Sequence, residues 1–224
     1  MYKNDEKYGA YVNILREELV PAMGCTEPIA LAYAAATARK VLGELPDRVV
    51  IGASGSIIKN VKSVIVPNTD HLKGIPAAAV AGIIAGKPEK ELEVIAEVTA
   101  EEIARMKEYL ENVEIKIEHI DNGLTFEIIV TLYKGKEYAK VRIANYHTNI
   151  VLIEKNGEVL KEVPVDDESE EGLTDRSLLN MKDIFDFAET VEIEDVKGIL
   201  DRQIEYNMAI AKETTAHIPS SARL

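Results

Sequence analysis

The hydrophobic pattern changes its period near residue 113, and this change limits the folds that are open to the chain. Upstream, apolar residues recur at helical spacing, as they do over residues 6–20. From residue 113 to 120 apolar and polar side chains alternate strictly, which is the period of a strand with one buried face. The chain therefore predicts helices first and a sheet after them.

Further strands are expected at 126–133, 137–144 and 149–154, because each is rich in β-branched and aromatic residues. Turn residues separate them, as in Asp121–Gly123 and Lys134–Lys136. The sequence thus predicts an antiparallel meander over about residues 113–163.

Two kinds of helix flank this meander. An alanine-rich helix follows Cys25 and ends near Gly43, and a small-residue helix covers 75–85. A short strand at 49–53 lies between them, and helical patterns return at 177–190 and 193–212. We therefore expect an α+β fold with N-terminal helices and short strands, a central antiparallel meander and C-terminal helices.

The expected organisation has three parts. Residues 1–112 form a helix-rich part that carries Cys25, residues 113–165 form the antiparallel β part, and residues 166–224 form C-terminal helices and a divergent tail. A chain of 224 residues with 46% hydrophobic content can bury all three in one compact domain.

Charge and composition exclude several classes of partner. The 26 Lys and Arg residues are scattered among 39 Asp and Glu residues, giving a net charge of −13, so we expect no nucleic-acid binding. No apolar run reaches the length of a membrane span, and no signal peptide is apparent. A single cysteine suits a reducing compartment, so we expect a cytoplasmic protein.

The octapeptide Pro21–Pro28 contains that cysteine, Cys25, just before the alanine-rich helix. Thr26 is the expected N-cap, Glu27 favours the positive helix end, and Pro28 suits the first turn. Free backbone N–H groups beside Cys25 would lower the pKa of its thiol and favour the reactive thiolate. The alternative is a buried cysteine that acts as a small apolar residue.

A second polar cluster follows the strand at 49–53. It contains Ser54, Lys59 and Asn60, and the nearby loop adds Asn68 and Thr69. Backbone N–H groups and an ammonium at such a strand end can bind a carboxylate or a phosphate. An ordinary strand and turn with solvated lysines is the alternative.

His147 lies in a tight polar turn between two expected strands, where it could act as an acid, a base or a ligand. A solvated turn histidine is the alternative. The other histidines are dispersed, and no pair of Cys or His residues has zinc-ligand spacing.

Taken in order, these segments resemble the L-cysteine desulfidase and iron-sulfur-dependent serine dehydratase alpha-chain-like family, over about residues 10–213. The segments are Pro-Ala-Met-Gly-Cys-Thr-Glu-Pro-Ile-Ala-Leu (21–31), Ser-Gly-Ser-Ile-Ile-Lys-Asn (54–60), Val-Pro-Asn-Thr (66–69) with Lys-Gly-Ile (73–75), and His-Thr-Asn-Ile (147–150) with Ile-Glu-Lys-Asn-Gly (153–157).

The resemblance implies a cytoplasmic lyase that carries out β-elimination from L-cysteine or L-serine and yields pyruvate and ammonia. It assigns Cys25 and His147 to catalysis, and Ser54, Lys59, Asn60, Asn68 and Thr69 to the substrate carboxylate. It also implies a 4Fe-4S cluster, with Cys25 as a ligand or as the base that removes the α-proton.

Family members are about twice this long and carry their other cluster cysteines in a second half. This chain resembles the N-terminal half, so we expect no cluster on it alone and no activity without a C-terminal cluster-binding half or subunit. One cleft should collect the four motifs, with an uncovered apolar face that could drive homo-oligomer formation. The alternative function is a non-catalytic small-ligand-binding or regulatory module of the same fold.

Overall fold

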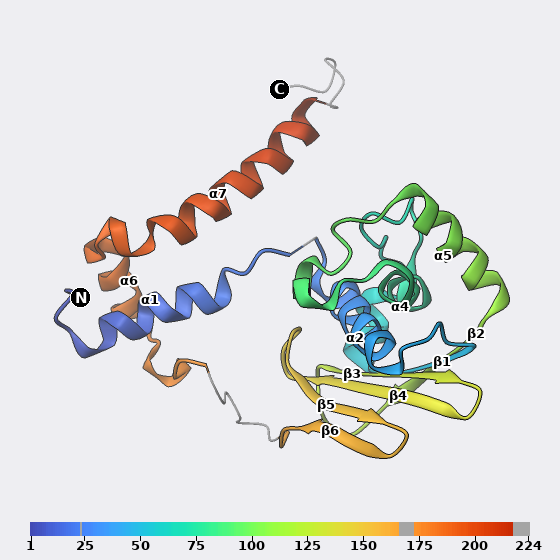
Figure 1. Ribbon diagram of the computed structural model, residues 1–224. Helices are drawn as coiled ribbons and strands as arrows, with labels where there is room; N and C mark the ends of the chain where they lie inside the picture. Colours follow the sequence, from blue (N-terminus) through green and yellow to red (C-terminus); the bar gives the residue numbers. More distant parts are fainter. Residues whose placement is uncertain (23, 166–172, 217–224) are drawn as a thin grey trace. The chain divides into compact units, whose positions relative to one another are not determined.

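The computed structural model describes residues 1–22, 24–165 and 173–216, and these residues form two compact units (Figure 1). The central unit comprises Ala22–Ser169, and the terminal unit combines Met1–Pro21 with Glu170–Leu224. Both ends of the chain therefore belong to one unit. The part boundary expected from the sequence after residue 112 falls inside the central unit, because strands on both sides of this boundary belong to one sheet.

Within the described residues, the central unit contains a six-stranded mixed sheet with the strand order β2-β1-β3-β4-β5-β6 (Figure 1). The last four strands make the expected meander, each antiparallel to the next. The strands are β1 (Arg48–Ser54), β2 (Glu114–Ile120), β3 (Glu127–Lys134), β4 (Glu137–Ala144), β5 (Ile150–Lys155) and β6 (Glu158–Glu162).

Strand β1 lies between β2 and β3, which corrects the expected meander at this edge. Val49 stands opposite Ile115 in a parallel pairing with β2 and opposite Leu132 in an antiparallel pairing with β3. The Asp121–Gly123 turn therefore joins strands that are not neighbours. Alternation identifies a strand, whereas its partner depends on packing that local sequence does not encode.

Helices α2 (Thr26–Leu42) and α4 (Gly74–Ala85) form the core of the helical layer on one face of the sheet (Figure 1). The alanine-rich face of α2 is almost wholly buried, and Gly43 ends the helix in the left-handed conformation, as predicted. The two helices approach closely at Gly82, where a Cβ atom would lie 2.1 Å from the carbonyl oxygen of Ala32. The small residues are thus required by the contact between helices.

The sheet buries one face and leaves the other polar. Ile128, Val130 and Leu132 of β3 are fully buried in the core, where β3 lies against α2. Lys140 and Arg142 alternate with buried residues along β4. This alternation is the pattern from which the strands were predicted, and the α+β class is confirmed.

Shorter elements connect these layers. Strand β1 is followed by α3 (Gly55–Val61), and a single bridge then joins Ile65 to Lys73. After α4, the 3₁₀ helix η1 (Pro88–Glu93) is followed by α5 (Ala100–Asn112), which begins with a capping box.

The terminal unit contains α1 (Glu6–Glu18), η2 (Arg176–Leu178), α6 (Met181–Thr190) and α7 (Ile193–Ala216). Its hydrophobic cluster contains Met1, Tyr8, Tyr11, Val12, Phe187 and Val196. Polar contacts support it: the Tyr8 hydroxyl donates to Asp195 at 2.9 Å, and Lys7 pairs with Asp183 at 2.7 Å. Helix α1 is therefore joined to α6 and to the start of α7 by both packing and charge.

Residues 166–172, where the third expected part begins, and the last residues of the divergent tail lie outside the described residues. Within the described ranges, no helix combines the length and apolar character that crossing a bilayer requires.

Candidate functional site

Cys25 lies at the start of α2 and is exposed. The structure makes Cys25 itself the N-cap, one residue before the predicted Thr26. Gly24 precedes it with a φ of 115°, a conformation that suits glycine. The extended backbone at Cys25 then leads into Thr26 and Glu27 as the first helical residues.

Glu27 links two of the predicted site residues. The Cys25 thiol donates to Oε2 of Glu27 at 3.0 Å, and the Asn60 amide donates to Oε1 at 3.3 Å. One carboxylate thus joins the start of α2 to α3. The sequence signal was present in the octapeptide, but an acidic residue in a first turn is usually explained by the helix dipole, so Glu27 was not selected as a site residue.

His147 belongs to the same region. Its half-buried ring lies edge-on to Phe126, with ring centroids 4.5 Å apart, and it interacts electrostatically with Glu27. Burial lowers the pKa of His147, and the Glu27 carboxylate opposes this shift. A lowered pKa favours a neutral imidazole near neutral pH, which can accept a proton at one ring nitrogen and donate a hydrogen bond from the other.

The pKa of the Cys25 thiol is raised, contrary to the sequence prediction. Partial desolvation is the largest cause, and the hydrogen bond and negative charge of Glu27 add to it. The backbone N–H of Glu27 acts in the expected direction but is outweighed. The pKa of Glu27 falls in turn, first through the Cys25 hydrogen bond. The pair therefore rests as thiol and carboxylate.

Ser54 has a structural position. It is 2% exposed, and its hydroxyl donates to the carbonyl of Thr125 at 2.8 Å. The same oxygen accepts from the backbone N–H of Glu127 at 3.3 Å. The side chain expected to bind a substrate carboxylate thus joins the end of β1 to the start of β3.

Asn68 and Thr69 shape their loop in a similar way. The Asn68 amide donates to the carbonyl of Ile95 at 3.1 Å, and the buried Thr69 hydroxyl donates to that of Val66 at 2.7 Å. Asn68, Asp70 and His71 all have positive φ, a cluster of costly conformations of the kind found at functional sites.

This loop lies next to the cysteine segment. A Cβ atom on Gly24 would be 3.5 Å from the Pro67 side chain. Lys59 is exposed on α3, directly before Asn60 in the chain. Contacts thus bring the Cys25, Asn60, Pro67 and His147 segments into one region, while the Ser54, Asn68 and Thr69 side chains are held by the protein itself.

A buried carboxylate missed by sequence reasoning lies near this region. Glu127 is fully buried and pairs with Arg142, whose Nε donates to it at 2.6 Å. The Asn122 amide donates to it at 2.7 Å. The neighbouring Phe126 carbonyl accepts from the N–H of Asn145, two residues before His147. This network supports the turn that positions the histidine.

The donor set does not fit a 4Fe-4S cluster by itself. Cys25 is the single cysteine in the sequence, whereas a cubane cluster takes about four ligands, usually thiolates. Among the residues that the structure describes, no three Cys, His, Asp or Glu side chains gather as a metal site would require.

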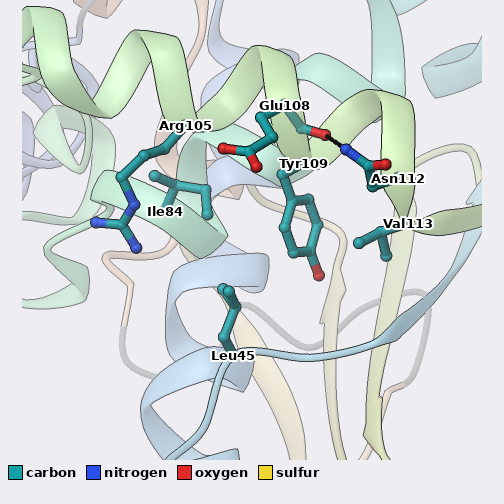
Figure 2. Close-up of a pocket in the computed structure, with 7 residues that line it drawn as sticks. All are labelled: Leu45, Ile84, Arg105, Glu108, Tyr109, Asn112 and Val113. Atoms are coloured by element: carbon teal, nitrogen blue, oxygen red, sulfur yellow. Dashed lines mark hydrogen bonds between the residues drawn. The ribbon is translucent and has the colours of Figure 1, made fainter.

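A pocket of about 330 Å³ lies elsewhere in the central unit, beyond the C-terminal end of α2 (Figure 2). Leu45, Ile84, Val113 and the ring of Tyr109 give it apolar walls. Figure 2 shows Arg105 and Glu108 extending from α5 around it, and Asn112 completes the lining. The sequence analysis did not select these residues, since none forms a recognisable motif.

Comparison with known proteins identifies a group of similar bacterial sequences that share one name, UPF0597 protein. This name states no activity, substrate or cofactor.

Three relatives show the extent of the similarity. The UPF0597 protein of Desulfitobacterium hafniense (strain Y51) is 55% identical over 212 residues, which is 95% of this chain and 49% of the relative. Those of Treponema denticola and Lachnoclostridium phytofermentans are 48% and 46% identical over 214 and 206 residues, covering 95% and 92% of this chain and 50% and 49% of the relatives. The chain thus spans about half the length of the curated relatives it matches. No family model matches the chain, and no solved structure does.

Proposed function

We propose that this chain is the substrate-side half of an iron-sulfur-dependent lyase that eliminates the β-substituent of L-cysteine or L-serine. The observation that supports this most is the meeting of Cys25, Asn60 and His147 around Glu27. These residues come from motifs far apart in the sequence, and local propensity does not require them to meet. The match covers 95% of this chain but only 49% of the D. hafniense relative. This coverage agrees with a chain that works with a second half.

The charges of the region suit a small amino acid. The exposed Lys59 ammonium and the Asn60 amide are groups that recognise a carboxylate, and the Glu27 carboxylate is a partner for the substrate ammonium. An ammonium beside Glu27 would offset the negative charge that holds Cys25 protonated. Substrate binding would therefore favour the Cys25 thiolate at the moment when a base is needed.

The proposed elimination breaks two bonds of the substrate. A base removes the α-proton, the Cβ–S or Cβ–O bond breaks with its electron pair on the leaving atom, and 2-aminoacrylate forms. Water then converts 2-aminoacrylate to pyruvate and ammonia. In the proposal Cys25 holds or accepts the α-proton, and the neutral His147 donates a hydrogen bond to the leaving atom or orients the substrate. These roles use only residues of this chain, whose donors do not fit a cluster by themselves.

The test is an anaerobic reconstitution of the chain with the half of the D. hafniense relative that it does not match. Sulfide release from L-cysteine, or pyruvate release from L-serine, is expected, and Cys25→Ser should abolish it. Glu27→Gln should reduce it, because Glu27 is the proposed partner of the substrate ammonium. Glu101→Gln is the control for that variant, because Glu101 has the same place in α5 that Glu27 has in α2. A folded complex that releases no pyruvate from either amino acid would reject the lyase. A cytoplasmic location is part of the proposal, supported by the free thiol of Cys25.

A second candidate, a non-catalytic small-ligand module, is favoured by the pocket in Figure 2. Apolar walls with a guanidinium and a carboxylate at the rim suit a zwitterion with an apolar side chain. Calorimetry with L-leucine is the measurement. Binding that Arg105→Ala weakens and Cys25→Ser leaves unchanged would support this candidate, and no detectable heat would reject it.

A further inference from the structure

Within the terminal unit, one apolar face of α6 is left exposed. Met181 is 81%, Phe185 69% and Ile184 41% accessible. Together with the exposed Ala188 they occupy positions i, i+3, i+4 and i+7, which lie on one face of a helix. We call these four residues the α6 stripe. Phe187, on another side of α6, packs against Tyr8 and Tyr11, so α6 carries apolar residues on two sides and buries only one of them in the terminal unit.

The core of the terminal unit is too small to account for this helix. Among the described residues, its hydrophobic cluster has six buried members and a few partly buried ones, which is few for α1, α6 and α7 together. Large apolar side chains at i, i+3, i+4 and i+7 are the anchors with which a helix fills a hydrophobic groove of a partner. Exposed stripes of this kind mark interaction sites.

We propose that the α6 stripe docks the polypeptide half that lies outside the matched region in the relatives. The relatives match 95% of this chain along only 49% of their own length, so the matching part occurs there joined to about as much additional protein. We propose that this additional half is the partner that binds the α6 stripe. This docking rests on the proposed function in one respect, namely that the chain works together with a second half. It does not require that the two halves catalyse a reaction.

The test begins with the chain alone. In a Cys25→Ser background, Phe185→Cys places a thiol on the stripe, and Lys182→Cys places one on the charged side of the same helix as the matched control. The rate of alkylation by iodoacetamide is measured for both. In the chain alone both thiols should react at similar rates, and light scattering should show a monomer.

The unmatched half of the D. hafniense protein is then added. Alkylation at Phe185→Cys should slow at least tenfold, while alkylation at Lys182→Cys should change little. In the native background, Met181→Ser with Phe185→Ser should weaken association at least tenfold, and Lys182→Ser should leave it unchanged. Circular dichroism of each variant confirms that the helices are retained.

Four results would overturn the proposal. The added half could fail to bind, or bind without slowing alkylation at Phe185→Cys. The chain alone could be a dimer that Phe185→Ser makes monomeric, in which case a second copy occupies the stripe. Slow alkylation of Phe185→Cys in the monomer would mean that the chain covers the stripe itself. A complex that forms through the stripe but releases no pyruvate or sulfide keeps the docking and rejects only the lyase.

Discussion

At the scale of single residues, two opposing effects act on the Cys25 thiol. The start of a helix favours a thiolate, but a carboxylate that accepts the thiol hydrogen disfavours one. The carboxylate belongs to Glu27, only two residues further along the same segment. The start of a helix therefore lowers the pKa of a cysteine thiol only where neighbouring side chains, such as a carboxylate, do not raise it by more.

Glu27→Gln should lower the pKa of Cys25, because it removes the negative charge that helps to hold the thiol protonated. The pH at which alkylation by iodoacetamide reaches half its maximal rate should move down. Glu101→Gln, at the matching position of α5, should leave that midpoint unchanged. An unchanged midpoint in Glu27→Gln would show that desolvation alone sets the pKa.

Ser54→Ala should destabilise the protein by about 1–3 kcal/mol, because it leaves the buried N–H of Glu127 without its partner and removes the hydrogen bond to the carbonyl of Thr125. Urea unfolding measures this change. If the variant unfolds like the parent while an assay detects weaker substrate binding, Ser54 contacts substrate as the sequence analysis expected.

The sequence could identify the motifs of this site but not the links between them. Cys25 and His147 were selected because their residue types carry chemistry, and the structure brings both to Glu27. Glu27 was missed because its role depends on a hydrogen bond from Asn60 on another helix. Ser54 looked like a ligand because a hydroxyl at a strand end is ambiguous until its acceptor is known.

At the scale of elements, the contact between α2 and α4 depends on the absence of a side chain at one position. Gly82→Ala would place a methyl group 2.1 Å from the Ala32 carbonyl oxygen, so the helices must separate. We expect a loss of about 1–3 kcal/mol, measured by thermal or urea unfolding. Gly9→Ala, in the open part of α1, is the control and should stabilise by about 0.5–1 kcal/mol. Equal effects at both positions would contradict the close approach.

Local signals were sufficient for most helices and strands. The alanine-rich run and Gly43 predicted helix α2, and the alternation of apolar and polar residues predicted the strands. In the structure, Thr99 caps the start of α5. The pairing of the strands was harder to predict from the sequence. The residues around Asp121–Gly123 favour a turn, and a hairpin there would place β3 beside β2. In the structure β1 lies beside β2 instead. Nothing in either strand's own residues encodes a neighbour from an earlier part of the chain.

At the scale of the whole molecule, the chain alone should retain no iron. One thiol per chain supplies too few ligands for a cubane cluster, which takes about four. After anaerobic incubation with iron and sulfide followed by desalting, the protein should be colourless and lack stoichiometric iron. Iron that remains bound in Cys25→Ser as in the parent would point to other ligands. Iron that depends on Cys25 in a multimer would point to a cluster shared between copies.

The insertion of β1 between β2 and β3 has a consequence for how the chain reaches its native state. A ribosome releases β1 well before β2 and β3, and β1 pairs with no strand made earlier. Until both partners emerge, its two edges are open and its apolar residues Val49 and Ile51 lack their sheet. High contact order of this kind slows folding, since distant segments must meet before pairing stabilises them. Newly made chains that stop short of Lys134 would therefore be the ones most in need of a chaperone.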